Sequence, residues 1–148
     1  MVIAIGSDHA GVDLKAEIIQ HLFNSKLYDV NVDDLGPNGW TSVDYPEYAK
    51  KVATAVLLGD ANFGILICGT GVGMTMAANR FSGIRAANIY DIEIAKLTRM
   101  HNDSNVLCLG ARFIELKKAF DIVDAWLTTS FEGGRHQRRI DAMDYLEG

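Results

Sequence analysis

The chain has 148 residues, a formal net charge of -5 and two cysteines. This length favours a single domain, the acidic balance argues against nucleic-acid binding, and two cysteines are too few for a disulfide framework. The apolar runs are too short to cross a bilayer, and the N-terminus carries no basic segment typical of a signal peptide. We therefore expect one domain over residues 1–148 in the reducing cytoplasm, with 133–148 as a C-terminal helical arm and no contact with membranes.

Short apolar runs alternate with helical patterns along the chain. Strands are predicted at residues 2–6, 28–32, 63–68, 83–88 and 105–110. Helices are predicted at residues 44–58, 71–80, 91–100 and 135–146, with two more around the apolar spacings that begin at Leu14 and Leu116. Residues 101–104 are predicted to be a loop. This alternation favours an α/β fold in which helices cover both faces of a parallel sheet.

Ligands of such folds bind beyond the carboxyl ends of the strands. Asp8 and His9 follow the first predicted strand, Cys68 and a glycine-rich loop end the third, and Arg112 follows the fifth. Because these strand ends lie at one edge of a parallel sheet, we expect the functional site there.

The segment Gly69-Thr70-Gly71-Val72-Gly73 joins the third strand to a helix. Its G-x-G-x-G spacing differs from the dinucleotide fingerprint, and no acidic ribose ligand stands out farther along, which weakens the alternative of a nucleotide-binding domain. Backbone N–H groups at such a helix start bind anions, either a phosphate or a developing oxyanion. The bland alternative is a tight turn that needs glycine only for a positive φ.

Cys68 stands directly before this loop. A helix N-terminus can lower a thiol pKa from about 8.5 toward 7, which makes Cys68 a candidate nucleophile or general base. A free cysteine is more commonly a small buried hydrophobe, and we assign that role to Cys108.

His9 and His101 are candidate acid/base groups, because histidine titrates near neutral pH. The alternatives are that Asp8 beside His9 merely caps a helix and that His101 is a solvated loop residue. We assign no chemical role to His21 or His136. The sequence shows no metal-ligand spacing such as H-x-x-x-H or C-x-x-C, so we expect no metal.

Every arginine lies at position 80 or later. Arg135 and Arg139 are four residues apart and share one face of the predicted terminal helix, where two guanidinium groups suit a phosphate. The alternative is a solvated basic surface. The residues alone thus indicate an α/β enzyme that acts on a small phosphorylated compound by acid/base chemistry beside a carbonyl, without a metal or nucleotide cofactor.

Several motifs, taken together and in order, resemble type B ribose-5-phosphate isomerases. That family also contains allose-6-phosphate isomerase and the two subunits of galactose-6-phosphate isomerase. The resemblance covers nearly the whole chain and rests on Ser7–Gly11, Asp44–Pro46, Cys68–Gly73, Gly83–Ala86, His101–Val106 and Glu132–His136.

The resemblance implies a three-layer α/β/α Rossmann-like fold with a five-stranded parallel sheet in the order 2-1-3-5-4, plus a C-terminal helix. It implies aldose–ketose isomerisation of a small phosphorylated sugar through a cis-enediolate, with no cofactor. It also implies a homodimer, or a tetramer, whose active sites lie at the subunit interface and draw some residues from the partner subunit.

The resemblance further implies roles for single residues. Cys68 would move the proton between C1 and C2, beside a loop whose N–H groups hold the enediolate oxygen. His101 with Asp8 and His9 would help to open the sugar ring, while Tyr45 and Asn102 contact the sugar. The loop residues are Gly69, Thr70, Gly71 and Gly73, and the phosphate-binding residues are Arg112, Arg135 and Arg139.

Departures within the family guide the expected substrate. One branch uses a glutamate at the position of Met74, so Cys68 is the only base candidate at that location here. The galactose-6-phosphate subunits depart from His101-Asn102-Asp103 and from the C-terminal Gly-Gly-Arg-His, and this chain keeps both. These features favour ribose 5-phosphate. The alternatives are a hexose 6-phosphate, whose length could be read at the less familiar loop 34–42, and a non-catalytic sugar-phosphate-binding subunit.

Overall fold

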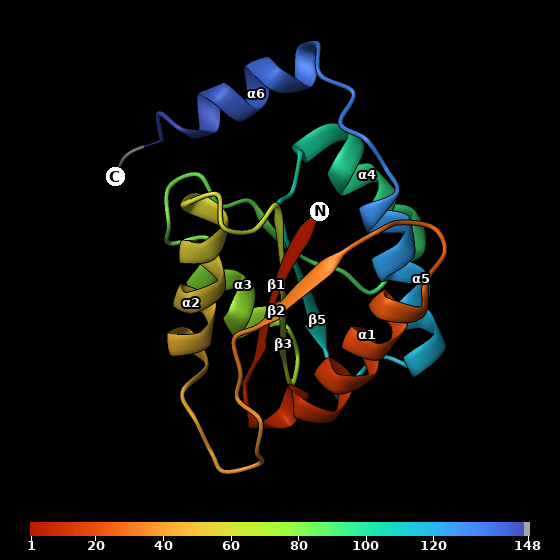
Figure 1. The fold of residues 1–148 in the computed structure, drawn as a ribbon. Helices are drawn as coiled ribbons and strands as arrows, with labels where there is room; N and C mark the ends of the chain where they lie inside the picture. The colour runs from red at the N-terminus through yellow and green to blue at the C-terminus, as the bar shows by residue number, and fades with distance from the viewer. Residues whose placement is uncertain (147–148) are drawn as a thin grey trace.

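The computed structural model describes residues 1–146, in which strands and helices alternate (Figure 1). The strands are β1 (Val2–Ser7), β2 (Asn31–Asp34), β3 (Phe63–Cys68), β4 (Ala86–Asn88) and β5 (Val106–Gly110). The helices are α1 (Val12–Asn24), α2 (Tyr45–Leu57), α3 (Val72–Ala78), α4 (Ile92–Asn102), α5 (Leu116–Leu127) and α6 (Arg135–Met143), and a short 3₁₀ turn, His9–Gly11, precedes α1.

The strands form one parallel sheet in the order β2-β1-β3-β5-β4, which confirms the predicted topology. In its register Ser7 pairs with Ile67, and Cys68 pairs with Gly110. The carboxyl ends of the three central strands therefore meet at one edge, which we call the carboxyl edge. The opposite edge, where the strands begin, is the amino edge.

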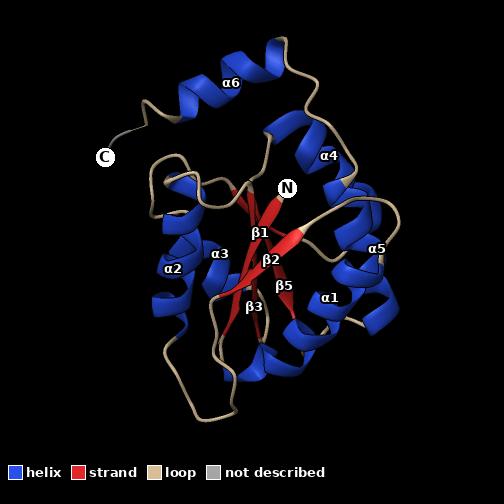
Figure 2. Cartoon of the chain, in the orientation of Figure 1, coloured by secondary structure: helices blue, strands red, loops and turns tan. Residues whose placement is uncertain are grey.

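Helices cover both faces of the sheet (Figure 2). An apolar core lies between the sheet and each of these helical layers. Ile3 and Ile5 of β1 face α1, α4 and α5, and Trp126 is fully buried in that layer. Ala4 and Cys68 face the other way, toward α2 and α3. Because side chains alternate along a strand, each buried strand contributes to both cores, which explains its continuous apolar sequence.

Two strands are shorter or shifted relative to the prediction. β2 begins at Asn31 because its partner β1 begins opposite it, at Val2. β4 begins at Ala86 because the Arg85 N–H donates to the Asn105 side chain at 2.8 Å instead of joining the ladder.

Helix α4 also differs from the prediction, since His101 and Asn102 form its last turn and do not belong to a loop. Asp103 ends the helix in the left-handed conformation, with φ of 45°, and its N–H donates to the Arg99 carbonyl. Aspartate tolerates this conformation better than most residues, a preference that helical periodicity does not reveal.

Helix α6 crosses above the amino edge as a separate arm that packs on α4 (Figure 1). It ends at Met143, earlier than the predicted 146, and Asp144 and Tyr145 form a turn. Residues 147 and 148 of the predicted arm lie outside the described residues. Within residues 1–146, none of the helices has the length and apolar character needed to cross a membrane.

Candidate active site

Cys68 ends β3 at the carboxyl edge with only 5% of its surface exposed. The Gly71 N–H donates to the Cys68 Sγ at 3.1 Å, so the loop folds back over the sulfur. The loop then enters α3 at Val72, where the first N–H groups of a helix have no acceptor within the helix. A thiolate at this position would be stabilised by the Gly71 N–H and by the start of the helix.

Gly71 is required by the shape of this loop. Its φ is 80°, and a Cβ atom would come within 2.3 Å of the Asn88 Oδ1. The Asn88 side chain donates to the Thr70 carbonyl at 3.3 Å, and the Tyr90 hydroxyl donates to the same carbonyl. The loop is thereby held from both sides, and the N–H groups of its glycines can be approached closely.

Residues from three other segments lie beside the loop. The Asp8 N–H donates to the Ile67 carbonyl at 3.0 Å, and its carboxylate accepts from the Ala10 N–H at 2.9 Å, so Asp8 does cap the 3₁₀ turn. A Cβ atom on Gly69 would lie 3.2 Å from the Arg112 guanidinium, and one on Gly73 would lie 2.8 Å from the Tyr45 ring.

The second cysteine is chemically different. Cys108 is fully buried in β5, on the same face of the sheet as Cys68. Burial, reinforced by the neighbouring Cys68, raises the pKa of Cys108 to about 12 although Thr75 opposes the shift. Cys108 is therefore a neutral thiol at physiological pH, as expected of a packing residue.

His101 lies at the amino edge, in the last turn of α4 and before β5 begins. A buried arginine fixes this helix end, because the Arg99 Nη1 donates to the Asp103 carboxylate at 2.8 Å and to the Ser104 carbonyl at 2.6 Å. The same guanidinium lies 4.8 Å from the centre of the Phe63 ring, beneath the helix. These bonds set the position of His101.

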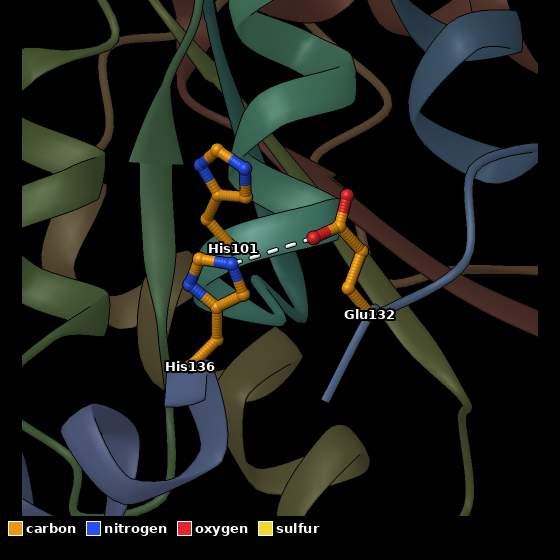
Figure 3. Close-up of side chains that lie close together, drawn as sticks. All are labelled: His101, Glu132 and His136. Carbon is orange, nitrogen blue, oxygen red and sulfur yellow. Dashed lines mark ion pairs between the residues drawn. The ribbon is translucent and has the colours of Figure 1, made fainter. Parts of the chain in front are cut away.

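The His101 ring stacks on His136 of α6, with ring centres 4.4 Å apart (Figure 3). The His136 Nε2 lies 3.4 Å from the Glu132 carboxylate. Burial, together with the charges of Arg135 and the neighbouring His101, lowers the pKa of His136. A histidine with no assigned role in the sequence is thus a direct neighbour of His101.

The structure separates the predicted site residues into two groups. One group surrounds the Cys68 loop at the carboxyl edge: Asp8, His9, Tyr45, Cys68, Gly69, Thr70, Gly71, Gly73 and Arg112. The other lies at the amino edge: His101, Asn102, Arg135 and Arg139. Since a strand rises about 3.3 Å per residue, the sheet holds the two groups well over 10 Å apart.

A groove of about 600 Å³ lies beneath α6 at the amino edge. Asn102 lines it together with Arg85 and Met143. This groove is therefore on the His101 side of the molecule, whereas Cys68 lies at the other edge.

Comparison with known proteins confirms the family that the sequence motifs predict. The ribose/galactose isomerase family model matches residues 3–143. The chain belongs to this family. It is 50% identical to ribose-5-phosphate isomerase B of Escherichia coli over 145 residues, which cover 98% of this chain and 95% of that protein.

Solved structures of family members superpose closely on the chain. The ribose 5-phosphate isomerase of Thermotoga maritima has a TM-score of 0.94 at 48% identity, with 98% of each chain covered. The ribose-5-phosphate isomerase B of Mycoplasma genitalium, solved with bound ribulose-5-phosphate, has a TM-score of 0.90 at 48% identity and covers 97% of this chain and 93% of its own.

The sequence reasoning missed several residues that shape the site. Asn88 and Tyr90 hold the loop, and because Asn88 ends β4 and Tyr90 follows it, the strand-end rule that selected Asp8 and Arg112 would have found them. Glu132 and His136 join His101 only through the path of the chain between α5 and α6. The segment Glu132–His136 carried part of the family resemblance, but nothing in the sequence pointed to its contact with His101.

Proposed function

We propose that the protein is an aldose–ketose isomerase that interconverts ribose 5-phosphate and ribulose 5-phosphate. The observation that carries this proposal is the Cys68 thiol at the head of the glycine loop, accepting the Gly71 N–H, in a chain with full-length relatives named ribose-5-phosphate isomerase B. The ribulose-5-phosphate bound to the Mycoplasma genitalium relative supports the same substrate.

In the proposed reaction the Cys68 thiolate removes the C2 proton of the open-chain aldose. The C2–H electron pair forms the C1–C2 double bond of a cis-enediolate as the negative charge moves to O1. O1 then takes up a proton and the O2 hydroxyl loses one, and the same thiol returns its proton to C1 while O2 becomes the carbonyl oxygen. General base catalysis of this kind contributes about 10²–10⁴-fold to the rate. N–H groups of Gly71 and Gly73, with Thr70, would stabilise the enediolate oxygen, where one donor contributes about 3–4 kcal/mol.

The remaining groups prepare and hold the sugar. Asp8, His9 and His101 would move the protons that open the ring, and Tyr45 and Asn102 would contact the open chain. Arg112, Arg135 and Arg139 would bind the phosphate, which orients the substrate without taking part in bond changes.

These roles require a second copy of the chain, so we include a homodimer in the proposal. A thiol at the carboxyl edge and an imidazole at the amino edge cannot act on one small sugar within a single chain. If two chains pack with opposite edges facing, each of two symmetric sites receives Cys68 from one subunit and His101 with the α6 arginines from the other. Both cysteines are free, which supports a reducing cytoplasm as the compartment.

Sugar length is proposed to be read near the loop between β2 and α2. The His9 Nδ1 accepts the Val43 N–H at 3.2 Å, so the end of this loop is tied to a predicted sugar-binding residue. A pentose phosphate is the substrate we favour, and a hexose 6-phosphate is the alternative.

The test compares kcat/KM for ribose 5-phosphate, allose 6-phosphate and galactose 6-phosphate. We expect ribose 5-phosphate to exceed both hexoses by at least about 10-fold. A higher value for a hexose would reverse the substrate assignment. Binding of these sugars without conversion, and without exchange of the C2 hydrogen for deuterium in D₂O, would identify a non-catalytic subunit.

A further inference from the structure

Three potential metal ligands meet at the amino edge, although they come from separate segments (Figure 3). His101 belongs to the last turn of α4, Glu132 to the connection between α5 and α6, and His136 to the first turn of α6. One nitrogen or oxygen atom from each lies within 4.8 Å of the other two.

The backbone holds these segments together independently of the side chains. The Glu132 N–H donates to the Met100 carbonyl at 3.1 Å, which fastens the connection to the end of α4. Gly133 and Gly134 then turn with φ of 70° and 58°, and the His136 N–H donates to the Gly133 carbonyl at 3.2 Å. The fold therefore brings the three backbone segments together, and the half-exposed Glu132 side chain can turn toward the two imidazoles.

The spacing suits a tetrahedral transition metal. Zinc binds histidine nitrogen and carboxylate oxygen at about 2.0–2.2 Å, which places neighbouring ligand atoms about 3.4 Å apart. The His136 Nε2 and the Glu132 carboxylate are already 3.4 Å apart. The two imidazoles are stacked, with an angle of 15° between their planes, so their nitrogen lone pairs do not yet converge. A rotation of the His101 ring, with a shift of up to about 1.5 Å, would complete a site of two histidines and one glutamate with the fourth position open.

His136 is also a buried polar group in need of a partner. It is 5% exposed, and among the described residues its Nε2 has no hydrogen-bond partner. A buried nitrogen without a partner is costly, and a metal ion is one of the few groups that can satisfy it.

We propose that His101, Glu132 and His136 form a binding site for a divalent transition metal such as Zn²⁺, and that the bound metal inhibits the enzyme by occupying His101. The inhibition rests on the proposed function, because it assumes that His101 helps to open the sugar ring. Metal binding itself does not depend on that function. The ligands select the metal: two imidazoles suit zinc, whereas Mg²⁺ and Ca²⁺ depend on several oxygen ligands and find one carboxylate here.

The binding test titrates metal-free protein with ZnCl₂ by calorimetry. Cys68 is itself a potential zinc ligand, so the titration is done in a Cys68→Ala background. We expect one zinc ion per chain, with affinity reduced at least about 10-fold by Glu132→Gln or His136→Gln. His21→Gln is the matched control, because His21 pairs with a single carboxylate, of Asp124 at 2.8 Å, and should leave binding unchanged. The proposed site would be overturned if zinc bound only when Cys68 is present, or if Glu132→Gln left the zinc affinity unchanged.

The inhibition test measures isomerisation in the Cys68-containing protein. Zinc should inhibit over the same concentrations at which it binds, and EDTA should reverse the effect. Measured against its own zinc-free rate, Glu132→Gln should need at least about 10-fold more zinc for inhibition. Zinc binding without inhibition of an active enzyme would refute the occupation of His101. A protein that binds zinc at this site but isomerises none of the sugars would instead refute the proposed function.

Discussion

The two edges of the sheet hold the predicted site residues by different means. At the carboxyl edge, main-chain bonds join the strand ends: the Ala111 N–H donates to the Cys68 carbonyl at 2.8 Å, and the Arg112 N–H donates to the Gly69 carbonyl at 3.1 Å. At the amino edge, His101 sits on a helix end fixed by the buried Arg99 side chain together with main-chain bonds, and the arginines are carried by an arm that packs on α4.

This difference indicates two different tasks. The thiol and its loop need a fixed geometry, because stabilisation of a developing charge depends on donors that are already in place. The arm instead reaches outward from its own chain, as a segment that contributes to a neighbour's site would do. In the proposed dimer each edge supplies one half of a site, and the following experiments test the two halves separately.

The largest effect is expected at the carboxyl edge. Cys68→Ala should lower kcat for ribose 5-phosphate by about 10²–10⁴-fold, because it removes the proposed base. Cys108→Ala is the matched control, since this thiol is buried and neutral, and its kcat should stay within a few-fold of the unmodified protein. Equal losses in the two variants would show that the effect of Cys68 is structural and not chemical.

A smaller effect is expected at the amino edge. Arg139→Ala should raise KM by about 10- to 100-fold with a lesser change in kcat, because a charged hydrogen bond to phosphate contributes about 1.5–3 kcal/mol to binding. Arg138→Ala removes the same charge from a different direction of α6 and should leave KM nearly unchanged. If the two variants raise KM equally, the arm acts only through its general charge.

The smallest expected effect is on the free energy of unfolding at high pH, and it comes from the buried Cys108 thiol. The folded protein keeps the Cys108 proton up to about pH 12, whereas an unfolded thiol loses it near pH 8.5. The unfolded state then binds fewer protons, so the free energy of unfolding should fall as pH rises from about 9, by up to about 1.4 kcal/mol per pH unit. Burial and the Asp124 hydrogen bond raise the pKa of Tyr28, which adds to the decline at still higher pH.

Urea unfolding at pH 8, 9 and 10 would measure this decline. The slope should be shallower in Cys108→Ala, which has no thiol to ionise in the unfolded chain. An unchanged slope in this variant would mean that Cys108 does not hold its proton in the folded state.

Much of the fold could be predicted from the sequence because its signals are local. Runs such as 63–68 mark strands buried on both faces, and the spacing of Leu14, Ile18 and Leu22 marks a helix, so the alternation of elements follows directly. The signals that place Cys68 before a glycine-rich turn and at the carboxyl edge are local as well.

The features that the sequence did not predict depend on contacts between segments that are far apart in the chain. The separation of His101 from Cys68 becomes visible only when the direction of α4 is known, because α4 runs back from the carboxyl edge to the amino edge. The turn of α4 at Asp103, the stacking of His101 on His136 and the approach of Glu132 all depend on tertiary packing, which neither periodicity nor motif spacing encodes.

The central claim is that each site combines the carboxyl edge of one chain with the amino edge of another. Cys68→Ala and His101→Ala should each be nearly inactive alone. Mixed after reversible dissociation, or produced together, they would form hybrid dimers in which one site has both residues intact, and random pairing should restore about one quarter of the unmodified activity. Activity that stays at the level of the separate variants, although hybrid dimers are demonstrably present, would contradict the account, because it would place both residues in a site within one chain.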